Sequence, residues 1–93
     1  MLGDVVGADP IDVHVGRNIR ARRRVMSLSQ QALAGTLGVS FQQVQKYENG
    51  TNRVSASALW RISQALGCSA NDLFEGNPTQ GEPAADTPEA VAI

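Results

Sequence analysis

The sequence predicts an all-α protein, a compact domain of five short helices with flexible termini. In several segments apolar residues recur three and four positions apart, which is the spacing of one face of a helix. Serine or aspartate precedes these segments and glycine follows several of them, as is typical of helix N-caps and C-caps. No segment alternates apolar and polar residues as a half-buried strand does, and 93 residues suffice for one small domain.

The first predicted helix begins at Asp12 and runs to about Met26. Asp12 can act as its N-cap, while Val15, Ile19 and Met26 form an apolar side and arginines occupy much of the rest. Residues 1–11 show no such periodicity, so we expect a flexible N-terminal arm there.

Two short helices joined by a tight turn follow. Ser29 is a good N-cap for a helix over 30–37, and Gly38 can supply the positive φ that ends it. Ser40 then opens the next helix, in which Gln43 would complete a Ser-x-x-Gln capping box. Gly50 closes this second helix, which is predicted over 40–49.

Two further helices complete the predicted domain, which spans 12–76. Ser55 starts a fourth helix, whose apolar residues repeat at i, i+3 and i+7 and include Leu59, Ile62 and Leu66. A short fifth helix is predicted over 69–74 and would end at Gly76. Beyond it, residues 77–93 combine prolines and acids with little periodic apolar content, so we expect a disordered acidic tail.

The chain has one cysteine and one histidine, which argues against disulfide and zinc-site chemistry. Cys68 is the single cysteine and His14 the single histidine, so neither a disulfide nor a Cys/His zinc site is predicted, and no metal or cofactor is expected. Cys68 is interpreted as a small packed side chain and His14 as a solvated or capping one. Trp60 and Tyr47 are predicted to be core residues.

No run approaches the roughly 18 apolar residues of a membrane helix, so we expect a cytoplasmic protein with no membrane partner.

Charge is distributed unevenly along the chain. All eight basic residues lie between positions 17 and 61, where Glu48 is the single acid, so this segment carries +8 − 1 = +7 although the whole chain carries −1. A basic block between acidic flanks suits a polyanionic partner, whereas the alternative is a solvated helix face. A lone carboxylate cannot run acid/base chemistry, and no glycine-rich phosphate loop or catalytic triad is present, so an enzyme is not predicted.

The helix that starts at Ser40 has one polar face. At 100° per residue its open side, an arc of about 140°, carries Phe41, Gln42, Gln45, Lys46 and Asn49. An α-helix fits the major groove of DNA, where a glutamine amide can pair with adenine and an apolar side chain can meet the thymine methyl. Gln42 and Gln45 are therefore candidate readers of adenine, and Phe41 of thymine. A generic helical hairpin with a polar solvent face is the alternative.

Over residues 12–76 the chain resembles a known family, the single-domain lambda-repressor/Cro-like (Xre) helix-turn-helix regulators. The residues that carry the resemblance are Leu28-Ser29-Gln30-Gln31, Leu33-Ala34, Gly38-Val39-Ser40, Val44-Gln45-Lys46-Tyr47-Glu48-Asn49-Gly50 and Leu66-Gly67. The resemblance implies a lambda-repressor-like DNA-binding domain whose second and third helices form the helix-turn-helix.

The resemblance also implies roles at the matching positions. Gln30 would contact phosphate and brace the recognition helix. The base-reading positions are Phe41, Gln42 and Gln45, and further contacts to base edges or backbone would come from Ser40, Gln43 and Lys46. The residues that would follow the phosphates are Asn49, Thr51, Asn52 and Arg53. Phe41 departs from the polar residue common at its position in this family.

Arg23 and Glu48 match a family pair that forms a partly buried ion bridge near the DNA backbone. For the other arginines of the first helix, phosphate contact and simple solvation both remain open.

We therefore expect a sequence-specific DNA-binding transcriptional regulator, a repressor that binds an inverted-repeat operator in double-stranded DNA as a homodimer. The candidate dimer interface is the fifth helix with Leu73 and Phe74, and core packing of these two residues is the alternative. Such a protein would be associated with the nucleoid when bound to DNA. The rival hypothesis is an antitoxin or protein-interaction module of the same fold that acts with a protein partner.

Overall fold

Four α-helices and one 3₁₀ turn make up the described part of the chain, residues 9–76 of a computed structural model. They are α2 (Pro10–Val25), α3 (Gln30–Leu37), α4 (Phe41–Asn49), α5 (Ala56–Ala65) and the 3₁₀ turn η1 (Asn71–Phe74). The all-α prediction is confirmed for these residues. Residues 1–8 of the predicted arm and the predicted tail, 77–93, lie outside the described residues.

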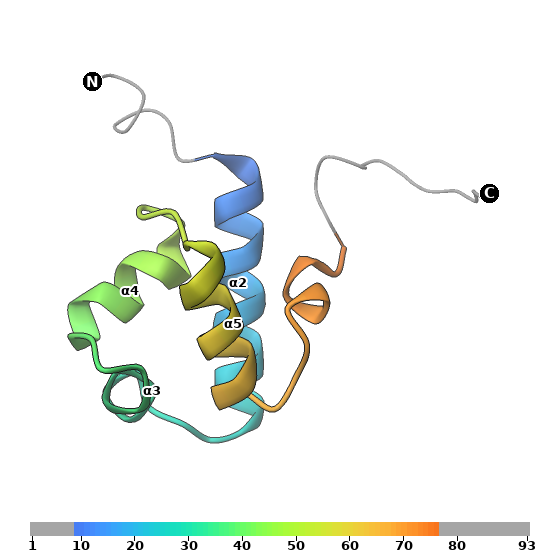
Figure 1. Cartoon of the computed structure of the whole chain (residues 1–93). Helices are drawn as coiled ribbons and strands as arrows, with labels where there is room; N and C mark the ends of the chain where they lie inside the picture. Colours follow the sequence, from blue (N-terminus) through green and yellow to red (C-terminus); the bar gives the residue numbers. More distant parts are fainter. Residues whose placement is uncertain (1–8, 77–93) are drawn as a thin grey trace.

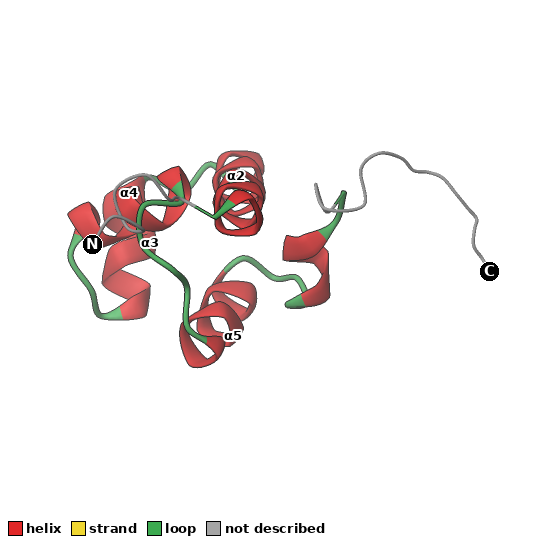
Figure 2. Ribbon diagram, turned by 90° about the horizontal axis from the view of Figure 1, so that it is seen from above, coloured by secondary structure: helices red, strands yellow, loops and turns green. Residues whose placement is uncertain are grey.

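The helix α2 packs directly against α4 and η1, and α3 packs against α4 and α5. Figure 1 shows α3 and α4 on one side of α2, η1 on the other, and α5 in front, running roughly alongside α2, and the view from above in Figure 2 agrees. One apolar core lies between them, formed by Val15, Ile19, Leu33, Ala34, Val44, Ile62, Leu66 and Leu73. Every described helix contributes to it, so the helix-turn-helix pair and η1 are held by the same core.

The N-terminus of α2 differs from the prediction. The helix begins at Pro10, and its N-cap is Asp9, whose carboxylate accepts the backbone N–H of Ile11 at 2.8 Å. Proline has no N–H to satisfy and its φ is already helical, so it stabilises the first position of a helix. The predicted cap, Asp12, lies in the first turn instead, where its charge complements the helix dipole.

The predicted caps of the other three helices are confirmed. At each N-terminus the hydroxyl of a serine accepts a hydrogen bond from a backbone N–H three residues later. Ser29 accepts from Ala32 at 2.9 Å, Ser40 from Gln43 at 3.1 Å, and Ser55 from Ala58 at 3.1 Å. Gly38 has a φ of 73° and Gly50 a φ of 76°, so each provides the left-handed residue that ends its helix. Of the Ser40–Gln43 capping box, the described residues show this first hydrogen bond alone.

The predicted fifth helix is the four-residue 3₁₀ turn η1. The backbone N–H of Ser69 donates to Asp72 Oδ2 at 2.9 Å, and the N–H of Asp72 donates to Ser69 Oγ at 3.1 Å. These reciprocal bonds tie one turn, and Gly76 with a φ of 77° follows closely, so no room remains for an α-helix.

A stripe on α2, formed by His14, Asn18 and Arg22, holds the end of η1. The ring Nε2 of His14 donates to the Glu75 carbonyl at 2.5 Å, and the Asn18 amide donates to the same carbonyl at 3.0 Å and to that of Leu73 at 2.8 Å. Arg22 lies 3.9 Å from the Glu75 carboxylate. His14 therefore caps the Glu75 carbonyl, and capping is one of its two predicted roles.

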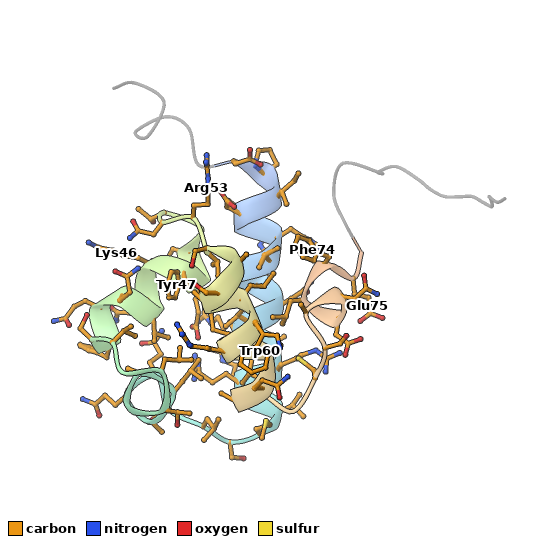
Figure 3. All side chains as sticks on the ribbon, viewed as in Figure 1. Lys46, Tyr47, Arg53, Trp60, Phe74 and Glu75 are labelled. Atoms are coloured by element: carbon orange, nitrogen blue, oxygen red, sulfur yellow. The ribbon has the colours of Figure 1, made fainter. Side chains whose placement is uncertain are left out.

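The prediction that Trp60 is a core residue is wrong, because 60% of it is exposed. Figure 3 labels this side chain on α5. Leu59 and Ile62, three residues apart on α5, pack in or against the core. Trp60 is the residue after Leu59, so its side chain is rotated by about 100° around the helix axis, away from the core. Tyr47, predicted to be a core residue, is half-buried and packs against the core. Cys68, predicted to be a small packed side chain, is half-buried against the core as well. Burial raises the pKa of the Cys68 thiol, so it stays protonated like other packed cysteines.

Candidate nucleic-acid interface

The helix α4 has one free face and one anchored face. Its exposed side chains are Gln42, Gln45, Lys46 and Asn49, whereas Val44 and Glu48 are buried. Figure 3 shows Lys46 extending away from the domain. The structure thus brings four predicted site residues together on one continuous surface, with hydrogen-bond donors and acceptors directed to solvent.

Phe41 lies at the edge of this face rather than on it. Its ring is half-buried and packs against the core cluster. This packing gives a physical reason for an apolar residue at a position that is commonly polar, since burying the ring stabilises the start of α4. Ser40 and Gln43 lie at the same end of the helix, where the Ser40 hydroxyl is engaged as the N-cap.

A buried ion pair joins α2 to α4. Arg23 Nε donates to Glu48 Oε2 at 2.6 Å and Arg23 Nη2 donates to Glu48 Oε1 at 3.0 Å, so the predicted pair is confirmed in bidentate form. The third contact of the guanidinium runs from Nη1 to the carbonyl of Leu28, at 2.8 Å, in the turn before α3. The hydrogen bond with Glu48 raises the pKa of Arg23, so its charge is permanent.

Gln30 extends this network to the N-terminus of α3. Its Nε2 donates to Glu48 Oε1 at 3.0 Å, so the side chain braces the recognition helix as the family resemblance implies. A carboxamide nitrogen carries two hydrogens, and Glu48 accepts one of them. The second is chemically suited to a phosphate oxygen, which accepts hydrogen bonds and cannot donate them. The phosphate contact itself stays a prediction.

Two glycines allow α2 and α4 to approach closely, a feature that the sequence analysis missed. A Cβ atom at Gly16 would lie 2.6 Å from the carbonyl oxygen of Glu48 and still closer to that of Tyr47. A Cβ atom at Gly50 would lie 2.6 Å from the Cα of Val13. The available signal was a glycine inside an otherwise helical pattern, which often marks close packing.

The segment after α4 carries the remaining predicted contacts. The backbone N–H groups of Thr51 and Asn52 donate to the Lys46 carbonyl at 3.0 and 3.3 Å, so they cap α4 and are not free for phosphate. Arg53 has a side chain that is 82% exposed, with its Nε 3.7 Å from Asp12 Oδ2. Arg53 is therefore the accessible cation of this segment.

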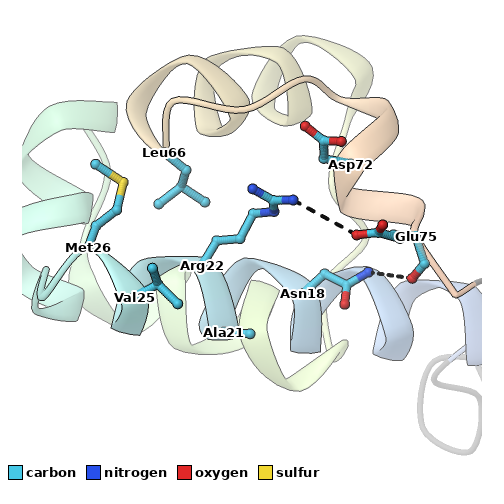
Figure 4. Close-up of a pocket in the computed structure, with 8 residues that line it drawn as sticks. All are labelled: Asn18, Ala21, Arg22, Val25, Met26, Leu66, Asp72 and Glu75. Atoms are coloured by element: carbon cyan, nitrogen blue, oxygen red, sulfur yellow. Dashed lines mark hydrogen bonds and ion pairs between the residues drawn. The ribbon is translucent and has the colours of Figure 1, made fainter.

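An open groove lies away from α4, between the end of α2, α5 and η1 (Figure 4). It has a volume of about 420 Å³, and Val25 and Met26 along it are 84% and 46% exposed. The predicted interface residues lie nearby on η1 and differ in burial. Leu73 is 0% exposed and fills the core of its own chain, so it has no surface to offer a second copy, whereas Phe74 is 37% exposed.

The described residues hold neither a cluster of metal-binding side chains nor a membrane-spanning helix. Residues 9–76 contain no group of three or more histidine, cysteine, aspartate or glutamate side chains arranged to hold a metal ion. None of the described helices has the length and apolar character needed to cross a membrane.

Comparison with known proteins places the same segment in one family. Residues 19–73 match the helix-turn-helix family model. A curated relative described as an uncharacterized HTH-type transcriptional regulator, from Sinorhizobium medicae, is 52% identical over 73 residues, which cover 78% of this chain and 52% of the relative. Repressor protein C2 of Salmonella phage P22 is 33% identical over 71% of this chain and 31% of its own length. The chain thus spans about half the length, or less, of these curated relatives.

Solved structures show the same domain in two settings. The restriction-modification controller protein C.AhdI from Aeromonas hydrophila superposes with a TM-score of 0.64 at 31% identity, covering 67% of this chain and 94% of that protein. Hydroxypropylphosphonic acid epoxidase from S. wedmorenis gives a TM-score of 0.65 at 28% identity, covering 68% of this chain but 34% of the enzyme. The likeness to the epoxidase concerns about a third of that protein.

Proposed function

Because this chain belongs to the lambda-repressor/Cro-like (Xre) helix-turn-helix family, we propose that it is a transcriptional regulator that binds specific DNA sequences through α4. The observation that carries this proposal is the two-sided character of α4. Its anchored side is fixed by Val44 in the core and by Glu48 in the ion pair with Arg23, while two glutamines, a lysine and an asparagine face solvent.

A rigid helix with exposed amides suits reading of base edges in the major groove. Gln42 and Gln45 are the proposed base-reading residues, with Asn49 beside them. Lys46 and Arg53 are proposed to contact phosphate, and Gln30 to contact phosphate from the other end of the motif. Phe41 is proposed to contribute a limited apolar contact, since its side chain is half-buried.

We propose further that the protein represses transcription as a homodimer on an inverted repeat, with half-sites about one helical turn, roughly 34 Å, apart. A single small domain buries little surface on DNA, so two copies are needed for tight binding. The phage P22 relative is a repressor, which supports the direction of regulation proposed for this chain. Phe74 on η1 is the proposed centre of the dimer interface, since Leu73 is buried in its own chain.

The test is selection of bound fragments from random duplex DNA, followed by footprinting on the enriched sequence. A transcriptional regulator of this kind should enrich one sequence with two-fold symmetry, and should occlude both halves together. Recovery of fragments with no common sequence would overturn the proposal of specific binding. Enrichment of an asymmetric single site would retain specific binding and overturn the dimer.

A protein partner is the second candidate, favoured by the groove that Val25, Met26 and Leu66 line (Figure 4). Contiguous exposed apolar side chains, such as those of Val25 and Met26, are a feature of protein-binding surfaces. In this reading the domain is an antitoxin or a similar module, and the partner covers the groove while α4 remains available. A toxin-like gene adjacent to this one, and a stable complex of the two products that Val25→Glu disrupts, would support it.

A further inference from the structure

We propose that three arginines on the outer side of α2, Arg17, Arg20 and Arg24, form a second phosphate-binding surface that lies beside the recognition helix. This proposal rests on the proposed function and extends it, because it assigns a DNA-backbone contact to a helix outside the helix-turn-helix pair. The residues recur at i, i+3 and i+7, which places them on one stripe of the helix, and all three are exposed.

The stripe formed by Arg17, Arg20 and Arg24 begins near the C-terminal end of α4. Val13, four residues before Arg17, lies on the same stripe and packs against Gly50, the residue that ends α4. Around the axis, Arg20 lies about 40° from Gly16, the residue that contacts the end of α4 directly. The arginines therefore border the side of α2 that faces the recognition helix.

Charge is divided between the two sides of α2. The acids of the C-terminal segment, Asp72 and Glu75, lie on the side of η1, where Arg22 approaches Glu75 at 3.9 Å. Arg23 is occupied by Glu48 in the interior. Among the described residues no carboxylate lies within ion-pair distance of the three stripe arginines. Three positive charges on one exposed stripe are costly by mutual repulsion, and a polyanion relieves that cost.

The spacing of the stripe suits a DNA strand. Seven residues of α-helix rise about 10 Å from Arg17 to Arg24, and one strand of a duplex presents a phosphate about every 3.4 Å along its axis. Arginine side chains are long and donate in a fork, so each can reach a phosphate without a change of backbone. The stripe is thus long enough for two or three phosphates of one strand.

The experiment compares two single variants that change the net charge equally on opposite sides of one helix. Arg20→Gln removes a stripe arginine, and Arg22→Gln removes the neighbour that faces η1; arginine and glutamine have similar helix propensities. Binding to the selected operator and to an unrelated duplex of equal length is measured from 50 to 200 mM salt. Circular dichroism at each step confirms that both variants are folded.

In Arg20→Gln the slope of log affinity against log salt should become shallower by about 0.9, the value for one lost phosphate contact. In the variant Arg17→Gln/Arg20→Gln/Arg24→Gln the change should be about three times as large, since three contacts are lost. Both duplexes should be affected alike, with the operator preference unchanged, and Arg22→Gln should leave the slope unchanged. Equal losses for Arg20→Gln and Arg22→Gln, or an unchanged slope for the triple variant, would overturn the phosphate surface. Failure of the proposed function would differ, because the wild type would then show no operator preference.

Discussion

The guanidinium of Arg23 on α2 and the carboxylate of Glu48 on α4 form a bidentate ion pair whose side chains are 10% and 2% exposed. Because Gln30 and the carbonyl of Leu28 bond to the same two groups, this pair joins the central helix, the turn before α3 and the end of the recognition helix. The orientation of α4 therefore depends on charges that water hardly reaches.

Removing one member of this pair should destabilise the domain strongly. Glu48→Met leaves the Arg23 guanidinium buried without its partner, Arg23→Met does the same to the Glu48 carboxylate, and an unpaired buried charge costs about 3–5 kcal/mol. The double variant Arg23→Met/Glu48→Met should lose much less than the sum of the single variants, since no charge remains buried. Urea unfolding monitored by the fluorescence of Trp60, the single tryptophan, measures all four corners of the cycle. Additive losses would show that the pair is energetically independent.

Gly16 should tolerate no side chain. In Gly16→Ala the new methyl group meets backbone carbonyls of α4, which cannot move aside, so we expect a loss of about 1–3 kcal/mol from overpacking. The matched control is Gly35→Ala on α3, where a Cβ would meet nothing within 4 Å. That change should stabilise the protein by about 0.5–1 kcal/mol through helix propensity. Thermal unfolding of both variants checks the opposite signs, and equal effects would contradict the close approach.

Acid should weaken the turn η1 through Asp72. Hydrogen bonds from the Ser69 backbone and hydroxyl lower the pKa of this carboxyl below its ordinary value. A lowered folded pKa means that the carboxylate stabilises the fold above the unfolded pKa, near 3.9, and that this contribution is lost as the pH falls through the folded value. Compared by urea unfolding, Asp72→Asn should be less stable than the wild type at pH 6, with the gap closing below about pH 4. A gap independent of pH would rule out the ionised carboxylate as its cause.

The dimer interface can be located with two exposed aromatic residues. Phe74→Glu should convert a dimer to a monomer in sedimentation experiments and abolish cooperative binding to the inverted repeat, because a charge placed in an apolar interface is costly to bury. Trp60→Glu is the control, since Trp60 is 60% exposed on α5 and lies outside the proposed interface. If Trp60→Glu disrupts the dimer and Phe74→Glu does not, the interface is on α5.

Local signals predicted the helix-turn-helix with accurate boundaries. Ser29, Ser40, Gly38 and Gly50 act through hydrogen bonds and backbone angles within a few residues, so their pattern is visible in the sequence. The N-terminus of α2 differs from its prediction, because Pro10 lies in the predicted arm although proline favours the first turn of a helix.

Features that depend on how helices cross could not be predicted in this way. Helical periodicity does not show that Gly16 touches α4, or that Trp60 lies outside the area that α5 covers. Similarly, the half-buried state of Phe41 depends on the neighbours that tertiary packing supplies. The Arg23–Glu48 pair was predicted from family resemblance and from the isolation of one acid among eight basic residues, not from local structure.

The most direct test of base reading by α4 is the binding of Gln42→Ala to the selected operator and to every single-base-pair variant of it. We predict a loss of about 1–3 kcal/mol on the operator and a relaxed preference at one base pair, with the other positions still discriminated. Lys46→Ala, as a phosphate contact, should instead weaken binding to all sequences alike. A uniform loss for Gln42→Ala across all variants, or no loss at all, would contradict the assignment of α4 as the base-reading helix.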